Sequence, residues 1–294
     1  MLDISQNMSS KISCIGLLLS LLAATPVVHA AEEYPPLPTW KCTNSGGCVQ
    51  QNTSVVLDQD SRYAQGAAGS RSAADYAAMG VSTSGNALTL YHYVKSGNTL
   101  NPASPRVYLL GADGKYVEMS LLNAELSVDV DFSTLPCGEN GAFYLSSMAA
   151  DGGGGSGAGK GYCDAQCQGF CCNEMDILEA NSQATAMTPH PCKGNNCDKG
   201  GCGYNPYASG QRGFWGPGKT VDTSKKFTVV TKFAANGGKL SQITRQYIQN
   251  GRQIGGGGTI SSCGAENSYG GLTGMGQALG TGSKSNFSRN MMKC

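Results

Sequence analysis

Short runs rich in Val, Leu, Tyr and Phe recur along the chain, separated by Gly, Asn and Pro. Runs bounded by such turn-forming residues are typical of β-strands. No long helical period interrupts them, and this spacing favours an all-β, antiparallel sandwich. The predicted strands are Ser54–Leu57, Ala87–Val94, Arg106–Leu110, Tyr116–Leu122, Glu125–Phe132, Ala142–Met148, Lys226–Phe233 and Gln242–Gln249.

The N-terminal 30 residues have the pattern of a secretory signal. Lys11 precedes an apolar run from Ile12 to Ala24, and Val28-His29-Ala30 is a small-residue cleavage site. The run is short for a membrane span, and no later segment is long and apolar enough to be one. We therefore expect residues 1–30 to be a signal peptide rather than a core helix. The mature protein is expected to be secreted and extracellular, without a membrane partner.

Charge and cysteine content restrict the remaining function classes. A formal net charge of +1 argues against nucleic acid as a partner. Of 13 cysteines, Cys14 lies in the expected signal, which leaves an even number in an oxidising compartment. A disulfide framework is therefore expected, with no cofactor and a monomeric chain. The alternative is a zinc site, although no finger-like spacing repeats; its ligands would come from Cys163, Cys167, Cys171, Cys172, His190 and Cys192.

Three carboxylates lie close together near the middle of the chain: Glu174, Asp176 and Glu179. Polar and apolar residues alternate from Glu174 to Ile177, which predicts a half-buried strand with Glu174 and Asp176 on one face. Glu179 lies an odd number of positions further on and would face the other way. One extra residue, as in a β-bulge, would return it to the first face, and bulges are common beside active sites.

Two glutamates on one face fit the chemistry of a retaining glycosidase, in which the carboxyl groups lie about 5–5.5 Å apart. Asp176 would hydrogen-bond the nucleophile and favour a protonated Glu179 by like-charge repulsion. Two alternatives need no catalysis: a solvated acidic loop or helix face, and a calcium site made of the three carboxylates.

The segments Gly161–Cys167 and Gly169–Asn181, which surround these carboxylates, resemble glycoside hydrolase family 7, the mostly fungal cellobiohydrolases and endo-β-1,4-glucanases. The resemblance extends from about Tyr34 to Gly280, with gaps. Further matching runs are Gly47–Gln51, Ala186–Cys192, Gly203–Tyr207, Phe214–Gly218 and Val221–Lys226.

The resemblance implies a β-jelly-roll sandwich with disulfide-rich loops and a concave cleft that binds a β-1,4-glucan polysaccharide. In that family pattern Glu174 is the nucleophile, Glu179 the acid/base and Asp176 the assisting carboxylate between them. The matching cleft-lining residues are Tyr144, Asp164, Gln166 and His190. Without the resemblance, Tyr144 would be interpreted as a core aromatic and His190 as a loop histidine bound to a carbonyl.

The resemblance also implies disulfide pairings. Cys137 remains after the matched pairs, and because its family partner lies near the end of the domain, Cys294 is the expected partner. The matched pairs are Cys42–Cys48, Cys163–Cys172, Cys167–Cys171, Cys192–Cys197 and Cys202–Cys263.

Two positions favour an endoglucanase over a cellobiohydrolase. Leu178 stands where cellobiohydrolases usually carry tryptophan, and Ala208 is also endoglucanase-like. The chain is short in the loops that roof a tunnel, which predicts an open cleft and cutting within glucan chains. The expected function is therefore a retaining endo-β-1,4-glucanase that hydrolyses cellulose or related β-glucans.

Parts of the chain depart from the family pattern. The segment Gln59–Ala74 is short and has no cysteine, and the match stops at Gly280. We therefore expect residues 31–280 to be an incomplete catalytic domain, followed by a divergent tail over residues 281–294. Loss of strands from a sandwich exposes apolar edges. The alternative function is accordingly a truncated, non-catalytic sandwich that binds β-glucan.

Overall fold

The computed structural model describes residues 31–66, 69–154, 156–264, 266–281 and 283–291. The expected signal peptide and Cys294 therefore lie outside the described residues. Within those residues, none of the helices has the length and apolar character needed to cross a membrane.

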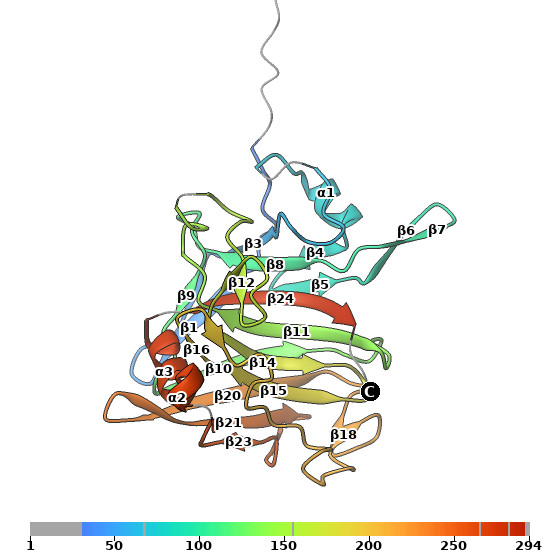
Figure 1. Ribbon diagram of the computed structural model, residues 1–294. Helices are drawn as coiled ribbons and strands as arrows, with labels where there is room; N and C mark the ends of the chain where they lie inside the picture. Colours follow the sequence, from blue (N-terminus) through green and yellow to red (C-terminus); the bar gives the residue numbers. More distant parts are fainter. Residues whose placement is uncertain (1–30, 67–68, 155, 265, 282, 292–294) are drawn as a thin grey trace, which may run out of the picture. The chain divides into compact units, whose positions relative to one another are not determined.

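The larger of two main sheets contains seven strands in the order β15-β14-β11-β24-β8-β3, with β9 pairing with β24 (Figure 1). Every pairing in this sheet is antiparallel. Its strands are β3 (Ser54–Leu57), β8 (Arg106–Leu110), β9 (Glu118–Met119), β11 (Glu139–Ser146), β14 (Glu174–Ala180), β15 (Thr185–His190) and β24 (Ser283–Met291).

The second sheet contains five strands in the order β10-β20-β21-β22, with β23 also pairing with β21. These pairings are antiparallel too, so the predicted all-β, antiparallel architecture is confirmed. The strands are β10 (Ala124–Val130), β20 (Phe227–Asn236), β21 (Lys239–Gln249), β22 (Arg252–Ile254) and β23 (Thr259–Ile260).

One hydrophobic core joins the two sheets into a sandwich. Leu145 and Ile177 of the larger sheet belong to the same buried cluster as Val229 and Ile243 of the smaller one. Burying a side chain of this size stabilises the fold by about 1.5–3 kcal/mol. Because β14 directs its apolar side chains into this cluster, its carboxylates are left on the opposite face of the larger sheet.

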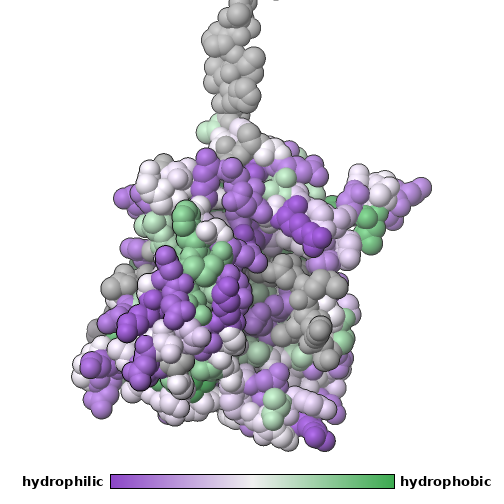
Figure 2. Space-filling view, in the orientation of Figure 1, coloured by the Kyte–Doolittle hydropathy of each residue, from purple (hydrophilic) through white to green (hydrophobic). Residues whose placement is uncertain are grey.

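The described residues also form six two-stranded sheets outside the two main sheets. Hydrophilic and hydrophobic residues are mixed over the face in Figure 2, from which the β6–β7 hairpin projects. Leu100 of this hairpin is exposed. The pairs are β1 (Thr39–Thr43) with β2 (Gly47–Gln51), β4 (Val81–Ser84) with β5 (Ala87–Leu90), β6 (Tyr93–Ser96) with β7 (Thr99–Pro102), β12 (Cys163–Asp164) with β13 (Phe170–Cys171), β16 (Cys192–Lys193) with β17 (Asn196–Cys197), and β18 (Trp215–Gly216) with β19 (Val221–Asp222).

Three helices were not predicted: α1 (Ala73–Ala78), α2 (Glu266–Tyr269) and α3 (Gly271–Thr281). Helix α3 buries Leu272, Met275 and Leu279 in the main core, at the helical spacing i, i+3, i+7. Its four glycines, poor helix formers, masked that pattern in the sequence. Tertiary packing of the apolar stripe therefore outweighs the local propensity.

Two predicted strands differ from the structure. Ala87–Val94 is not one strand, because β5 ends at Leu90 and β6 begins at Tyr93. Tyr116–Leu122 contributes only the two residues of β9. Backbone atoms of Tyr116 and Val117 bond instead to Ala150 and Leu109, which keeps this segment out of a longer ladder.

Part of the expected C-terminal tail forms a central strand. The backbone of β24 pairs with β11 from Lys284↔Ser146 to Met291↔Glu139, and with β8 around Phe287↔Val107. In Figure 1 it lies between these two strands. The polar sequence of β24 does not predict a central strand. Its position depends instead on backbone hydrogen bonds with β11 and β8.

Candidate active site

The central feature of the site is an irregularity in strand β14. On the β11 side, Tyr144 pairs with Asp176 and Phe143 with Leu178, so Ile177 is an extra residue without a partner. On the β15 side the register also shifts between Asp176 and Glu179. The β-bulge predicted from the spacing of the glutamates is therefore present.

The bulge places Glu179 on the same side of the sheet as the other two carboxylates. Ile177 and Leu178 are both fully buried in the core, whereas Glu179 forms a side-chain hydrogen bond with Asp176. The charge of Asp176 also acts on Glu174. The three carboxylates therefore form one interacting group.

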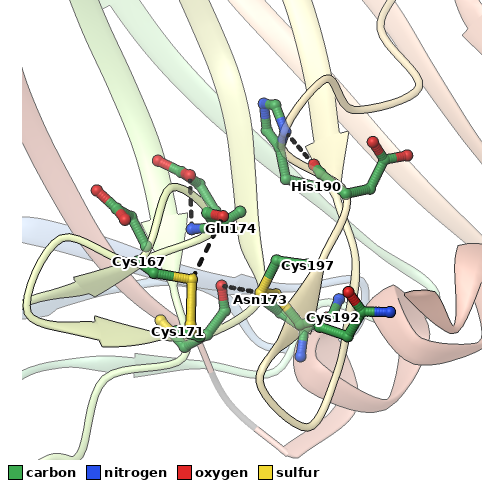
Figure 3. Close-up of a disulfide and its surroundings, with 12 residues drawn as sticks. Cys167, Cys171, Asn173, Glu174, His190, Cys192 and Cys197 are labelled. Atoms are coloured by element: carbon green, nitrogen blue, oxygen red, sulfur yellow. Dashed lines mark hydrogen bonds between the residues drawn. A yellow bond between two sulfur atoms is a disulfide. The ribbon is translucent and has the colours of Figure 1, made fainter. Parts of the chain in front are cut away.

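A hydrogen-bond donor is bound to each carboxylate. The backbone N–H of Ala165 donates to Oε2 of Glu174 over 3.1 Å, as Figure 3 shows. The Asn140 amide donates to Oε1 of Glu179 over 2.9 Å. Nε2 of His190 lies 3.1 Å from Oδ2 of Asp176. A calcium ion would have to displace these donors, so the contacts do not favour the calcium alternative.

Burial controls the ionisation of both glutamates. Burial, and then the charge of Asp176, raise the pKa of Glu174 to about 8. The same two causes, in the same order, raise the pKa of Glu179 to about 7. The expected like-charge effect of Asp176 on Glu179 is therefore present, but loss of solvation is the larger cause.

His190 is the cation of the group. Burial lowers its pKa, but the hydrogen bond to Asp176 and the charge of that carboxylate outweigh burial and raise the pKa to about 9. Its other ring nitrogen, Nδ1, lies 2.8 Å from the carbonyl oxygen of Asp198. A carbonyl oxygen only accepts, so Nδ1 carries a proton and Nε2 faces Asp176.

The other predicted cleft residues differ in whether they contact the three carboxylates. Tyr144 faces Asp176 across the ladder, and its hydroxyl donates to that of Tyr162 over 3.2 Å. Asp164 is buried, and its charge contributes to the raised pKa of Glu174. Gln166 is exposed, and its amide donates to the carbonyl of Lys199 over 2.8 Å. No contact between Gln166 and the carboxylates was found among the described residues.

Sequence reasoning missed Asn140, the direct partner of Glu179. Asn140 lies between Gly138 and Gly141, a composition typical of a turn, but β11 already begins at Glu139. Asn173 was also missed, and its Oδ1 accepts the backbone N–H of Cys192 over 2.7 Å. An asparagine beside glycine usually signals a turn, so Asn140 gave no functional signal.

All five matched disulfides are present: Cys42–Cys48, Cys163–Cys172, Cys167–Cys171, Cys192–Cys197 and Cys202–Cys263. Cys137 is also disulfide-bonded, and Cys294, its predicted partner, lies outside the described residues. The bonds of Cys163 and Cys167 hold the segment around Ala165 against the start of β14. Figure 3 shows the Cys167–Cys171 disulfide near Glu174.

The disulfides rule out the zinc alternative. The sulfur atoms of Cys167, Cys171 and Cys197 do gather within 4.8 Å of one another. However, each belongs to a disulfide, and zinc binds the free thiolate. The cysteines of the proposed zinc set are all oxidised in the same way.

Comparisons with known proteins identify the family that the chain matches. The family model for glycosyl hydrolase family 7 matches residues 70–169 and 168–264. Endoglucanase EG-1 of Hypocrea jecorina is 47% identical over 313 residues, covering 88% of this chain and 68% of that protein. Endo-beta-1,4-glucanase celB of Aspergillus oryzae is 41% identical over 345 residues, and the match covers 90% of this chain and 83% of the Aspergillus protein.

Solved structures agree in fold. The native endocellulase EGI of Humicola insolens superposes with a TM-score of 0.76 at 34% identity, covering 89% of this chain and 86% of that one. An endoglucanase I complexed with cellobiose superposes with a TM-score of 0.77 at 33% identity, and the match covers 90% of this chain and 86% of that one.

Proposed function

The chain belongs to glycosyl hydrolase family 7, and from this membership and the carboxylate geometry we propose that it is a retaining endo-β-1,4-glucanase. The observation that carries the proposal is the bulge in β14, which brings Glu179 to the face that holds Glu174 and Asp176. Two carboxyls on one face are what a double displacement at a sugar carbon requires.

In the first step a carboxylate oxygen of Glu174 attacks the anomeric carbon, and the glycosidic bond breaks. Glu179 gives its proton to the departing oxygen, so the leaving sugar departs as a neutral alcohol. In the second step Glu179 takes a proton from water, and the resulting nucleophile displaces Glu174 from the sugar. Glu179 thus acts as acid and then as base, which fits a pKa of about 7.

Glu174 must lose its proton before it attacks. Two contacts lower its pKa and so favour the carboxylate: the N–H of Ala165 and the positive charge of His190. Positive charge that develops at the anomeric carbon favours the anion further. Asp176, bound to His190, contributes its charge to the pKa of Glu179 and holds the neighbouring acid through a hydrogen bond.

The substrate class follows from the relatives. Proteins with 41–47% identity are named endoglucanases or endo-β-1,4-glucanases, and one structural neighbour was solved with cellobiose. Leu178 and Ala208 match the endoglucanase pattern, which supports internal cutting of β-1,4-glucans. The disulfides are consistent with an oxidising, extracellular location.

The decisive experiment uses purified residues 31–294 and a soluble cellulose derivative. We expect a cooperative thermal melt, release of reducing ends, and retention of anomeric configuration in the first-formed product. Glu174→Gln should abolish the release without lowering the melting temperature, since the amide oxygen still accepts from Ala165. Full activity in that variant would refute the assignment, and binding of glucan without turnover by the wild type would replace it with a binding function.

A further inference from the structure

A buried arginine crosses the sandwich to the catalytic strand. Arg245 lies on β21 of the smaller sheet and is 1% exposed. Its guanidinium donates to the backbone carbonyl of Ile177, at the bulge of β14 in the larger sheet. Nε of Arg245 also donates to Oγ1 of Thr231 over 3.1 Å. Thr231 is the directly opposite residue on β20, so this pair fixes the direction of the side chain.

The contact lies where the ladder itself cannot provide a partner. Ile177 is the extra residue of the bulge and pairs with no residue of β11. A bulge leaves its extra residue outside the regular hydrogen-bonding pattern, and a buried carbonyl without a donor is costly. Arg245 therefore provides a donor for the residue that the bulge leaves without a partner on β11.

Burying a guanidinium in a hydrophobic core costs free energy, because the charged group loses its solvation. Arg245 lies two residues from Ile243 and from Tyr247 on β21, both of which belong to the main apolar cluster, and burial lowers its pKa. An apolar residue of similar volume would cost less to desolvate at this position. What arginine adds is a long, forked donor that reaches the opposite sheet.

We propose that Arg245 is a positioning residue for the acid/base Glu179, which it serves by holding the bulge through the Ile177 carbonyl. This inference rests on the proposed function of Glu179. Strand side chains alternate in direction, so relaxation of the extra residue would rotate Glu179 away from Asp176 and from the leaving oxygen. Glu174 lies before the bulge and would keep its place.

The test separates protonation of the leaving group from nucleophilic attack. Phenyl β-cellobioside needs a proton on its leaving oxygen, whereas dinitrophenyl β-cellobioside releases a stable anion and needs little acid assistance. For Arg245→Met we expect kcat on the phenyl substrate to fall on the order of 10–100-fold, part of the range for general acid catalysis. On the dinitrophenyl substrate kcat should change much less. Glu179→Gln should also lower kcat more on the phenyl substrate than on the dinitrophenyl substrate, and by a larger factor than Arg245→Met.

A matched control is available in Arg71, another buried arginine, which pairs with Glu32 away from the site. Arg71→Met should lower the melting temperature and leave the ratio of the two kcat values unchanged. Thr231→Val and Arg245→Lys serve as milder variants if Arg245→Met does not melt cooperatively. Both should shift the ratio in the same direction by a smaller factor.

Equal loss on both substrates in every folded variant would overturn the inference, and so would no loss on either. A wild-type chain that does not hydrolyse either substrate would instead overturn the proposed function together with this inference. An active wild type with an unchanged ratio in Arg245→Met and Thr231→Val would overturn the role of Arg245 alone.

Discussion

Nε2 of His190 lies 3.1 Å from Oδ2 of Asp176, although His190 stands directly opposite Glu174 in the ladder between β14 and β15. The imidazole therefore reaches diagonally along the sheet to the next residue on the same face. A diagonal neighbour of this kind is within reach of a long side chain. It ties the assisting carboxylate to a second strand, so the orientation of Asp176 depends on β15 as well as on β14.

Loss of this contact should reduce turnover. His190→Gln removes the positive charge beside Asp176 but keeps a polar side chain. A hydrogen bond to a charged group contributes about 1.5–3 kcal/mol, so we expect kcat to fall on the order of 10–100-fold. The control is His92→Gln, because His92 is also buried but binds Ser104 outside the site. A similar fall in both variants would contradict a specific role for His190.

Glu174 and Glu179 interact, with pKa values raised to about 8 and about 7, and turnover needs one proton on the pair, held by Glu179 as the acid. Activity should therefore decline as the pH rises through about 8, the pKa at which the pair loses its last proton. Asp176→Asn removes a negative charge that raises this pKa, so its alkaline limb should move to lower pH. Burial remains in the variant, and the limb should therefore stay above the ordinary glutamate range. The measurement is kcat against pH for both proteins. A limb that moves to higher pH would contradict the electrostatic explanation.

The site should make the protein less stable as the pH rises. The folded-state pKa of Glu174 is raised from 4.5 to about 8, and that of His190 from 6.5 to about 9. The folded state therefore holds more protons than the unfolded state between these values, and the free energy of unfolding falls as the pH rises from about 4.5 to about 9.

We expect the melting temperature at pH 5 to exceed that at pH 8, with about 2–4 °C for each kcal/mol in a chain of this size. Glu174→Gln removes one of three groups with a raised pKa, the others being Glu179 and His190, so its melting temperature should depend less on pH. Thermal melts of both proteins across this range test the point. An unchanged slope in the variant would show that Glu174 keeps an ordinary pKa.

The disulfide at the start of β14 should matter for catalysis as well as for stability. Replacing Cys163 and Cys172 by alanine frees the segment that donates the Ala165 N–H to Glu174. We expect a loss of about 2–4 kcal/mol of stability and a lower kcat in the protein that remains folded. Replacement of Cys42 and Cys48 is the control, because their bond closes the β1–β2 hairpin, a two-stranded sheet separate from the one that contains β14. That control should keep its kcat.

Chelation should not affect the fold. The carboxylates of Glu174, Asp176 and Glu179 already accept hydrogen bonds or form an ion pair within the protein. We therefore expect the melting temperature to be the same with and without a strong chelator, and the same after addition of calcium. A rise on adding calcium would revive the structural-metal interpretation of the three carboxylates.

How much of the site the sequence could predict depended on the range of each interaction. The bulge was predictable because alternation along one strand is local, and only an extra residue brings Glu179 into phase with Glu174. The partner of Glu179 was not predictable, because Asn140 belongs to another strand and its neighbours are typical of a turn. Arg245 gave no signal either, since its contact with Ile177 joins two sheets.

The fold was predictable to a similar extent. Alternating and apolar runs such as Arg106–Leu110 predicted β8 residue for residue. Helix α3 was missed because its glycines hide an apolar stripe. The disulfides followed from the family resemblance, since cysteine positions alone allow many pairings.

The position of β24 has a consequence for biosynthesis. On one side of this strand lie β11, β14 and β15, and on the other β8 and β3; among the described ladders only β24 joins the two groups. A nascent chain leaving the ribosome therefore holds an open edge on β11 until residues 283–291 have emerged. Closure of the sheet then depends on contacts far apart in the chain, which form slowly. Chaperones that shield exposed strand edges should accordingly improve the yield of folded protein.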